Sequence, residues 1–302
     1  MDKEKIRETV RDKYGSIARR SAGVTTETSQ ATACCGTTDI QTEILPMASC
    51  CAPTDQDAGK ESASTCCGTE DFSVENMAAY LGKLGYTKED LENVPEGANM
   101  MLGCGNPVAL ASLKPGEAVV DLGCGGGFDC FLAAKEVGET GRVIGVDMTP
   151  DMISKARKNA EKIQTTNVEF RLGEIEHLPI ADNTVDIIMS NCVINLSPDK
   201  QRVYSDAYRV LKPGGRLAIS DVVATAPLPD EVRNDLALLS ACIGGAATIE
   251  DTEKMLKEAG FVQIKIVPHD KSREIIREWN PEKSKKGWDY VVSAYIEACK
   301  PS

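Results

Sequence analysis

The sequence is poor in residues that several common functions require. Its 302 residues include only two histidines, His177 and His269, which leaves little room for histidine-centred catalysis or a multi-histidine metal site. No stretch approaches the roughly 20 apolar residues of a transmembrane helix. The N-terminal segment 1–20 is charged and has no apolar signal core. We therefore expect a soluble cytoplasmic protein with no membrane partner.

The sequence also has fewer basic than acidic residues. The chain carries 34 Lys and Arg against 46 Asp and Glu, which gives a formal net charge of −12 and a pI near 4.8. Such an acidic balance disfavours binding to nucleic acid or to anionic membranes, so we expect neither partner. A chain of this length can bury one large α/β core together with a smaller appendage.

Cysteine, by contrast, is abundant, with 12 residues. Without a secretory signal, these cysteines indicate reactive or metal-binding thiols more than a structural disulfide framework. Segment 21–70 is rich in Ser, Thr, Ala and Gly over most of its length and poor in large apolar residues, which predicts a mobile linker. The linker contains three adjacent cysteine pairs at a spacing of sixteen residues: Cys34 and Cys35, Cys50 and Cys51, and Cys66 and Cys67.

The paired cysteines are not arranged as a zinc site. Adjacent cysteines do not supply the C-x-x-C geometry of a zinc knuckle, and no histidine lies near them. They can form a vicinal disulfide or present thiols to a soft ion. The pairs therefore indicate a thiol relay or a soft-metal collector, unless they are incidental cysteines of a mobile segment.

A run of glycines organises the centre of the chain. Asp121 ends an apolar segment, Gly123, Gly125 and Gly127 follow at alternate positions, and a helical pattern begins directly afterwards. Glycines let a ligand approach the backbone, and the start of a helix offers unpaired N–H groups. The spacing is G-x-G-x-G and not the G-x-G-x-x-G of dinucleotide-binding proteins.

A second acid ends the next predicted strand. Segment 142–147 finishes at Asp147, where a carboxylate can accept hydrogen bonds from a ribose diol. Two acids that end successive strands, with this glycine spacing, resemble the nucleoside-binding start of class I S-adenosylmethionine-dependent methyltransferases. A tight strand-to-helix turn without a ligand is the alternative. The resemblance implies cofactor contacts from Asp121, Gly123, Cys124, Gly125, Gly127, Asp147 and Met148.

Two further segments lie where this cofactor is expected. Glu174, Ile175 and Glu176 follow the third predicted strand and can contact the adenine edge, with either acid accepting from its amino group. A solvated acidic loop is the alternative for these residues. Asn191 follows the fourth predicted strand, at the edge of the cofactor cleft.

The alternation of apolar strands and amphipathic helices predicts an α/β fold, a doubly wound and mostly parallel seven-stranded sheet of the Rossmann-like type. Ligands then bind at the carboxyl ends of the strands. We expect strands near 118–122, 142–146, 167–171, 185–190, 215–221, 262–267 and 289–298. We expect helices near 2–19, 73–82, 87–93, 107–113, 127–137, 150–163, 199–210, 230–241 and 250–259. The predicted units are an N-terminal helix 1–20, the linker 21–70, a methyltransferase core 71–225, and a cap with the last strands, 226–302.

Three single cysteines lie near the expected cleft. Cys104 stands between two glycines just before a predicted helix, whose dipole would favour the thiolate. Cys192 follows the fourth predicted strand, and Cys242 lies in the region that would cap the cleft. Each of them alone could be a buried apolar cysteine, which is the commonest fate of free cysteine.

Taken together, the cysteine motifs closely resemble those of the arsenite methyltransferases. The resemblance runs from Tyr14-Gly15 to Gly260-Phe261. Its marks are Leu102-Gly103-Cys104-Gly105, Val146-Asp147-Met148-Thr149, the run from Ser190 to Leu196, Pro198-Asp199-Lys200, and Cys242-Ile243-Gly244-Gly245-Ala246.

The resemblance implies roles for individual cysteines. Cys104, Cys192 and Cys242 would bind trivalent arsenic, which makes region 226–302 an arsenic-binding cap, and Cys34 or Cys35 would take part in disulfide exchange. The substrate would be arsenite or its thiol conjugates, and thioredoxin or glutathione would be the final reductant. This chain departs from the family in its additional cysteine pairs, and in having Met101 and Leu102 where tyrosines often precede the glycine.

The chemistry of arsenic agrees with this interpretation. Trivalent arsenic is soft and prefers thiolate sulfur. Its lone pair is already a nucleophile, so methylation by a sulfonium needs no general base, which suits a chain with two histidines. The predicted reaction gives mono- and dimethylated arsenicals and serves arsenic detoxification. The alternatives are a small-molecule C-, O- or N-methyltransferase with structural cysteines, or a soft-metal-binding or sensing protein on a methyltransferase scaffold.

Overall fold

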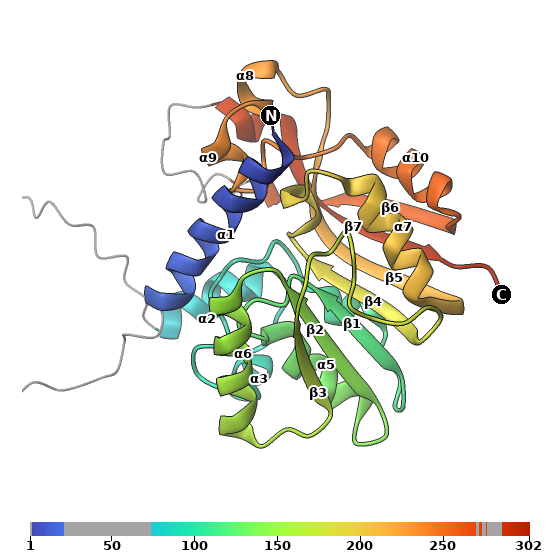
Figure 1. The fold of residues 1–302 in the computed structure, drawn as a ribbon. Helices are drawn as coiled ribbons and strands as arrows, with labels where there is room; N and C mark the ends of the chain where they lie inside the picture. The colour runs from blue at the N-terminus through green and yellow to red at the C-terminus, as the bar shows by residue number, and fades with distance from the viewer. Residues whose placement is uncertain (1, 21–73, 270–271, 274–275, 277–285) are drawn as a thin grey trace, which may run out of the picture. The chain divides into compact units, whose positions relative to one another are not determined.

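The computed structural model describes residues 2–20, 74–269, 272–273, 276 and 286–302 (Figure 1). The predicted linker 21–70, with Cys34, Cys35 and the two other cysteine pairs, lies outside the described residues. The division into 1–20, 21–70, 71–225 and 226–302 therefore stays a prediction.

A seven-stranded sheet forms the centre of the fold, in the order β3-β2-β1-β4-β5-β7-β6. Strands β1 to β5 pair in parallel, and β7 runs antiparallel between β5 and β6. The predicted doubly wound, mostly parallel sheet is confirmed. The strand bounds are β1 Ala118–Leu122, β2 Arg142–Asp147, β3 Val168–Leu172, β4 Val185–Asn191, β5 Leu211–Ala224, β6 Val262–His269 and β7 Val291–Cys299.

Helices cover both faces of the sheet because the central strands are apolar on both sides. Val119 faces one apolar cluster and its neighbour Val120 faces another, as the period-two geometry of a strand requires. The first cluster includes residues of α4 (Pro107–Ala111), α5 (Phe128–Val137) and α6 (Pro150–Ile163). The second includes residues of α7 (Lys200–Val210) and α10 (Ile249–Ala259) (Figure 1). This arrangement leaves the carboxyl ends of the parallel strands for the loops that form the site.

The remaining elements are all helical. They are α1 (Lys3–Arg20), α2 (Val74–Lys83), α3 (Lys88–Glu92), α8 (Asp230–Arg233), α9 (Leu236–Leu239) and the short 3₁₀ helices η1 (Ile194–Leu196) and η2 (Lys286–Tyr290). Helix α1 packs against α6 and η1 and buries Ile6 and Val10. Among the described residues, no helix is both long and apolar enough to cross a bilayer.

Two predicted helices differ from the structure. Segment 230–241 was expected to form one helix, which is wrong: it forms α8 and α9, because Asp235 adopts an extended backbone and accepts hydrogen bonds from the N–H groups of Ala237 and Leu238 as an N-cap. Helix α4 ends at Ala111, before the predicted end at 113, because Ser112 adopts a left-handed backbone with φ 47°.

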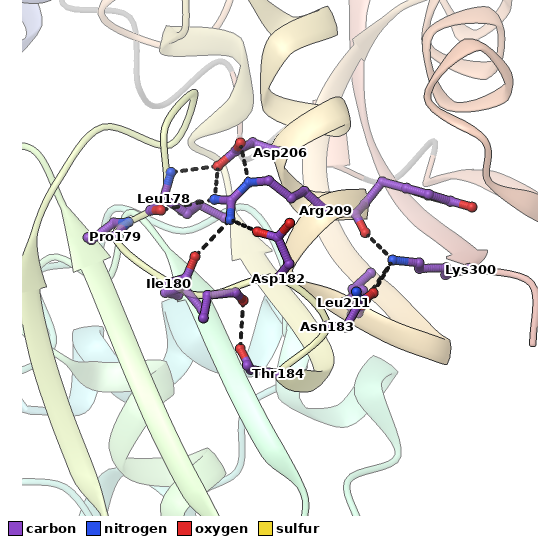
Figure 2. A network of polar contacts seen from close by, with 12 residues as sticks. Leu178, Pro179, Ile180, Asp182, Asn183, Thr184, Asp206, Arg209, Leu211 and Lys300 are labelled. Carbon is purple, nitrogen blue, oxygen red and sulfur yellow. Dashed lines mark hydrogen bonds and ion pairs between the residues drawn. The ribbon is translucent and has the colours of Figure 1, made fainter.

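An ion pair between a buried aspartate and a partly exposed arginine fixes the connection between β3 and β4. Figure 2 shows Asp206 and Arg209 of α7, whose side chains join at 2.9 Å. Asp206 also accepts from the Leu178 N–H at 2.6 Å, and Arg209 donates to the Ile180 carbonyl at 2.8 Å. Burial alone would raise the pKa of Asp206, but the hydrogen bonds from Arg209 and Leu178 hold that pKa below its ordinary value. The pair therefore holds the loop 178–182 against α7.

Candidate active site

A cavity lies at the carboxyl ends of β2, β1 and β4, which are neighbours in the sheet. This is the place that the topology of a parallel sheet offers to a ligand. The predicted cofactor residues that line it are Asp121, Gly123, Cys124, Gly125, Asp147, Met148, Ile175, Glu176 and Asn191. Gly127 and Glu174 are not part of the lining.

The glycine pattern is explained by local geometry. Gly123, Gly125 and Gly127 all have positive φ, at 68°, 51° and 92°. A Cβ atom on Gly123 would lie 2.2 Å from Val193, and one on Gly127 would lie 2.8 Å from the ring of Phe131. Gly127 thus serves the packing of the turn, while Gly123 and Gly125 lie on the cavity wall.

Asp147 closes one side of the glycine turn. Its carboxylate accepts from the N–H of Gly125 at 3.0 Å and from the N–H of Thr149 at 2.8 Å. Burial raises the pKa of Asp147, although these backbone hydrogen bonds oppose the rise. A half-buried carboxylate at the end of β2 is therefore held at the cavity wall.

The two acids after β3 have different surroundings. Glu176 is 3% exposed and accepts from the Ser197 hydroxyl at 2.7 Å, with the guanidinium of Arg7 at 3.7 Å. Glu174 instead forms ion pairs with Arg7 and Arg11 of α1, at 3.4 Å and 3.9 Å. Only Glu176 lines the cavity, while Glu174 joins the loop to α1.

Asp129 is a site residue that the sequence analysis missed. It lies in the first turn of α5, where an acid is commonly a helix-dipole partner, so its position alone carried no signal. Its carboxylate lines the cavity and accepts from the Tyr86 hydroxyl at 2.6 Å and from the Asn191 amide at 3.1 Å. Burial raises the pKa of Asp129 to about 6. Burial and the charge of Asp129 also raise the pKa of Asp121. Two buried carboxylates thus line one cavity.

Asn191 connects the end of β4 to the Cys104 loop. Its Oδ1 accepts from the N–H of Cys104 at 2.9 Å, and its Nδ2 donates to the carbonyl of Gly105 at 2.9 Å. A Cβ atom added to Gly103 would lie 2.6 Å from the Asn191 amide. A Cβ atom added to Gly105 would lie 2.3 Å from the Ser220 hydroxyl. The two glycines that flank Cys104 are therefore needed for the loop to dock on the sheet.

The structure brings the three predicted arsenic ligands together. Cys104, Cys192 and Cys242 belong to one buried cluster, with exposures of 5%, 4% and 3%. The Cys242 thiol donates to the carbonyl of Cys192 at 2.9 Å, and Cys104 Sγ lies 3.6 Å from the Ser220 hydroxyl. Hydrogen bonds to Cys104 and Cys242, followed by burial, raise the pKa of the Cys192 thiol.

Backbone strain accompanies this arrangement. Cys192 and Cys242 adopt left-handed backbones, with φ of 58° and 62°, which are unusual for residues other than glycine.

In the part of the chain that the structure describes, no three His, Cys, Asp or Glu side chains already converge to form an ion-binding site. The three thiols are thus neighbours whose sulfurs have not converged on one point.

Helix α1 covers both the cavity and the thiols. Tyr14 lines the cavity, and its hydroxyl donates to the carbonyl of Ser240 at 3.4 Å. Lys13 donates to the same carbonyl at 2.9 Å. The pKa of Tyr14 is raised by burial, then by the nearby thiols of Cys242 and Cys192. The helix therefore holds the Cys242 segment in place beside the cavity.

Comparison with known proteins identifies the family. A family model described as a methyltransferase domain matches residues 113–260. An arsenite methyltransferase from Halobacterium salinarum is 48% identical over 301 residues, which cover 100% of this chain and 68% of that protein. The chain belongs to the arsenite methyltransferase family. The resemblance drawn from the cysteine motifs is thus confirmed.

Other arsenite methyltransferases match this chain over part of their length. The human enzyme is 39% identical over 192 residues, which cover 60% of this chain and 51% of that protein. A solved arsenic(III) S-adenosylmethionine methyltransferase from Chlamydomonas reinhardtii is 34% identical, with a TM-score of 0.52 over 74% of this chain and 73% of that one. A phosphoethanolamine N-methyltransferase from Haemonchus contortus shares the fold. It is 20% identical, with a TM-score of 0.55 over 74% of this chain and 60% of that one.

Proposed function

We propose that the chain transfers a methyl group from S-adenosylmethionine to trivalent arsenic bound by Cys104, Cys192 and Cys242. One observation carries the proposal. The three thiols come from three distant parts of the chain and lie in one buried cluster, and Cys192 also lines the cavity beside the glycine turn. The substrate is arsenite or a thiol conjugate of arsenite.

Arsenic binding needs no base from the protein. Each thiol that replaces a hydroxyl of arsenite gives up its proton to that hydroxyl, which leaves as water. The raised pKa of Cys192 is therefore no obstacle, because the proton departs with the leaving group. Three sulfurs hold arsenic as a neutral pyramid with its lone pair outward. Binding would draw the three neighbouring sulfurs onto one point.

The cavity residues fit S-adenosylmethionine, which supplies an electrophilic methyl group on a sulfonium when bound. Asp147 would accept hydrogen bonds from the ribose diol, and Met148 and Ile175 would flank the adenine. Asp121 and Asp129 would hold the ammonium of the amino-acid end, since two buried carboxylates favour a cation between them. The order of the strands supports this orientation of the cofactor. Strand β2, which ends at the proposed ribose site, lies on one side of β1. Strand β4, which is followed by Cys192, lies on the other side of β1.

Helix α1 supplies the closure of the site. Arg7 contacts Glu174 and Glu176 beside the nucleoside end, and Tyr14 contacts the Cys242 segment beside the thiols. A closed site excludes water and holds the reacting groups in fixed positions. We infer that α1 serves both reactants.

A thiol cycle would complete each turnover. Methyl transfer oxidises arsenic to the pentavalent state, and two cysteine thiols return it to the trivalent state by forming one disulfide. Cys34 or Cys35 would reduce that disulfide by exchange, and thioredoxin or glutathione would supply the two electrons for the last step. This cycle places the enzyme in the reducing cytoplasm, where it would detoxify arsenic.

The proposal is tested by product analysis. The full chain is incubated with arsenite, S-adenosylmethionine and reduced thioredoxin. The arsenic species are then separated and identified by mass spectrometry. We expect mono- and dimethylated arsenicals. Methylation of small organic acceptors with arsenite unchanged would favour a small-molecule methyltransferase, and tight binding of zinc or copper without turnover would favour a soft-metal sensor. Either result overturns the proposal.

The acid pair predicts a pH dependence of cofactor binding. Burial raises the pKa of Asp129 to about 6, and only the ionised carboxylate attracts the cofactor's ammonium group. Affinity for S-adenosylmethionine should therefore rise from about pH 5 to about pH 7.5 and then level off. Asp129→Asn should weaken binding about tenfold at the upper end and reduce the slope of the profile, to which Asp121 would still contribute.

Isothermal titration calorimetry across this pH range, without arsenic, measures the effect. Asp230→Asn is the matched control, because Asp230 is exposed at the start of α8 and does not line the cavity. A flat profile for the unchanged protein, or the same slope in Asp129→Asn, would contradict the role of Asp129.

A further inference from the structure

One buried amide nitrogen on the cavity wall has no hydrogen-bond partner among the described residues. Among the described residues, the buried side-chain nitrogens and oxygens without a hydrogen bond are Arg7 Nε, Asn99 Nδ2 and Ser190 Oγ. Arg7 and Asn99 line the cavity, and Arg7 still has Glu174 at 3.4 Å. Asn99 Nδ2 is thus a cavity donor left without a protein acceptor. A buried donor without an acceptor is costly, so such a group points to a ligand that supplies one.

The orientation of this amide is fixed by its own loop. Asn99 Oδ1 accepts from the N–H of Met101 at 2.8 Å, and Met101 has a left-handed backbone with φ 55°. Exchanging the oxygen and nitrogen would place two donors against each other. The oxygen therefore faces the loop, and the NH₂ group is left for another acceptor.

The Asn99 loop lies directly on the glycine turn. A Cβ atom on Gly126 would lie 2.8 Å from the carbonyl oxygen of Ala98, and one on Gly125 would lie 3.1 Å from the methyl group of Met100. The turn leads into α5, a helix of ten residues whose N-terminus favours negative charge. Asn99 is therefore placed where an anionic group of the cofactor would be stabilised.

The ribose diol and the ammonium group of the cofactor have their own proposed partners in the cavity. Asp147 is assigned to the ribose, and Asp121 and Asp129 to the ammonium. The one anionic group of the cofactor is the carboxylate of the amino-acid end, which needs a donor and is repelled by acids.

We propose that Asn99 Nδ2 donates a hydrogen bond to the carboxylate of S-adenosylmethionine and so selects a cofactor that carries this group. The inference rests on the proposed function for the identity of the cavity's ligand. It makes Asn99 a specificity-determining residue on the cofactor side of the reaction.

The test compares two ligands that differ in this one group. S-adenosylmethionine and decarboxylated S-adenosylmethionine are titrated into the full chain by calorimetry, without arsenic. Asn99→Asp keeps the acceptor for Met101 and the size of the side chain, but replaces the donor by a carboxylate. We expect its Kd for S-adenosylmethionine to rise about tenfold or more, and its Kd for the decarboxylated ligand to change less than about threefold.

Two further variants make the result decisive. Asn99→Ala removes the donor without adding charge, and should lose affinity for S-adenosylmethionine selectively but by a smaller factor. Asn93→Asp, an exposed asparagine in the same segment that does not line the cavity, should bind both ligands as the unchanged protein does. Equal weakening of both ligands in Asn99→Asp and Asn99→Ala, or no weakening of either, overturns the proposal.

This outcome is separable from that of the proposed function. A protein that binds S-adenosylmethionine with the expected selectivity but leaves arsenite unmethylated keeps the role of Asn99 and loses the reaction. A protein that methylates arsenite with no carboxylate selectivity keeps the reaction and loses the role of Asn99.

Discussion

Replacing Cys192 by serine is expected to lower the rate of arsenite methylation by more than about a hundredfold, because a hydroxyl is a hard and poor ligand for soft arsenic. The side chain stays nearly the same size, so the buried cluster and the cavity wall should keep their shape. The Kd for S-adenosylmethionine should therefore stay within about threefold of its original value. Product formation is followed by mass spectrometry and cofactor binding by calorimetry.

Cys299→Ser is the matched control for this substitution. Cys299 is a free, half-buried cysteine at the end of β7, outside the thiol cluster and the cavity lining. Its loss should leave methylation unchanged. Cys104→Ser and Cys242→Ser should behave like Cys192→Ser if all three sulfurs bind arsenic. Full activity in any of these three variants would remove that cysteine from the arsenic site.

The second large effect is expected from Gly245→Ala. A Cβ atom on Gly245 would lie 2.0 Å from the carbonyl oxygen of Asn195, so the segment that carries Cys242 must move away from η1. The hydrogen bond of 2.9 Å from Cys242 to the carbonyl of Cys192 would then be broken. We expect a loss of about 2 kcal/mol or more in unfolding free energy. Affinity for arsenite should fall more than about tenfold.

Denaturant unfolding and arsenite titration measure these two effects separately. S-adenosylmethionine should still bind to the folded variant, because Gly245 does not line the cavity. Gly82→Ala is the control: no atom lies within 4 Å of the added carbon, and alanine favours the helix that Gly82 occupies. An unfolding free energy and arsenite affinity equal to those of the unchanged chain would show that the Gly245 contact does not hold Cys242 in place.

The fold was largely predictable because its signals are local. Apolar runs that end in Asp121 and Asp147 identify two buried strands, and the glycine spacing identifies the turn between β1 and α5. The error at 230–241 has the same origin. Asp235 acts as an N-cap only because the chain turns there, and an asparagine followed by an aspartate within a helical pattern does not show this on its own.

The site was predictable only in part, because much of it depends on tertiary contacts. Asp129 became a candidate through its hydrogen bond to Tyr86, which lies 43 residues away in sequence. Glu174 and Glu176 stand two positions apart on one loop, yet only the packing of α1 decides which of them faces the cavity. The proximity of Cys104 to Cys192 likewise depends on the Asn191 amide and on the glycines around Cys104, whose contacts no pattern reveals.

The position of α1 has a consequence for the order of events during turnover. The same helix bonds to the segment beside the thiols through Tyr14 and Lys13 and to the loop after β3 through Arg7. Any outward displacement of α1 would therefore expose the cavity and the thiol cluster together. If both reactants bind as proposed, release of the spent nucleoside and of the methylated arsenical would depend on the same helix.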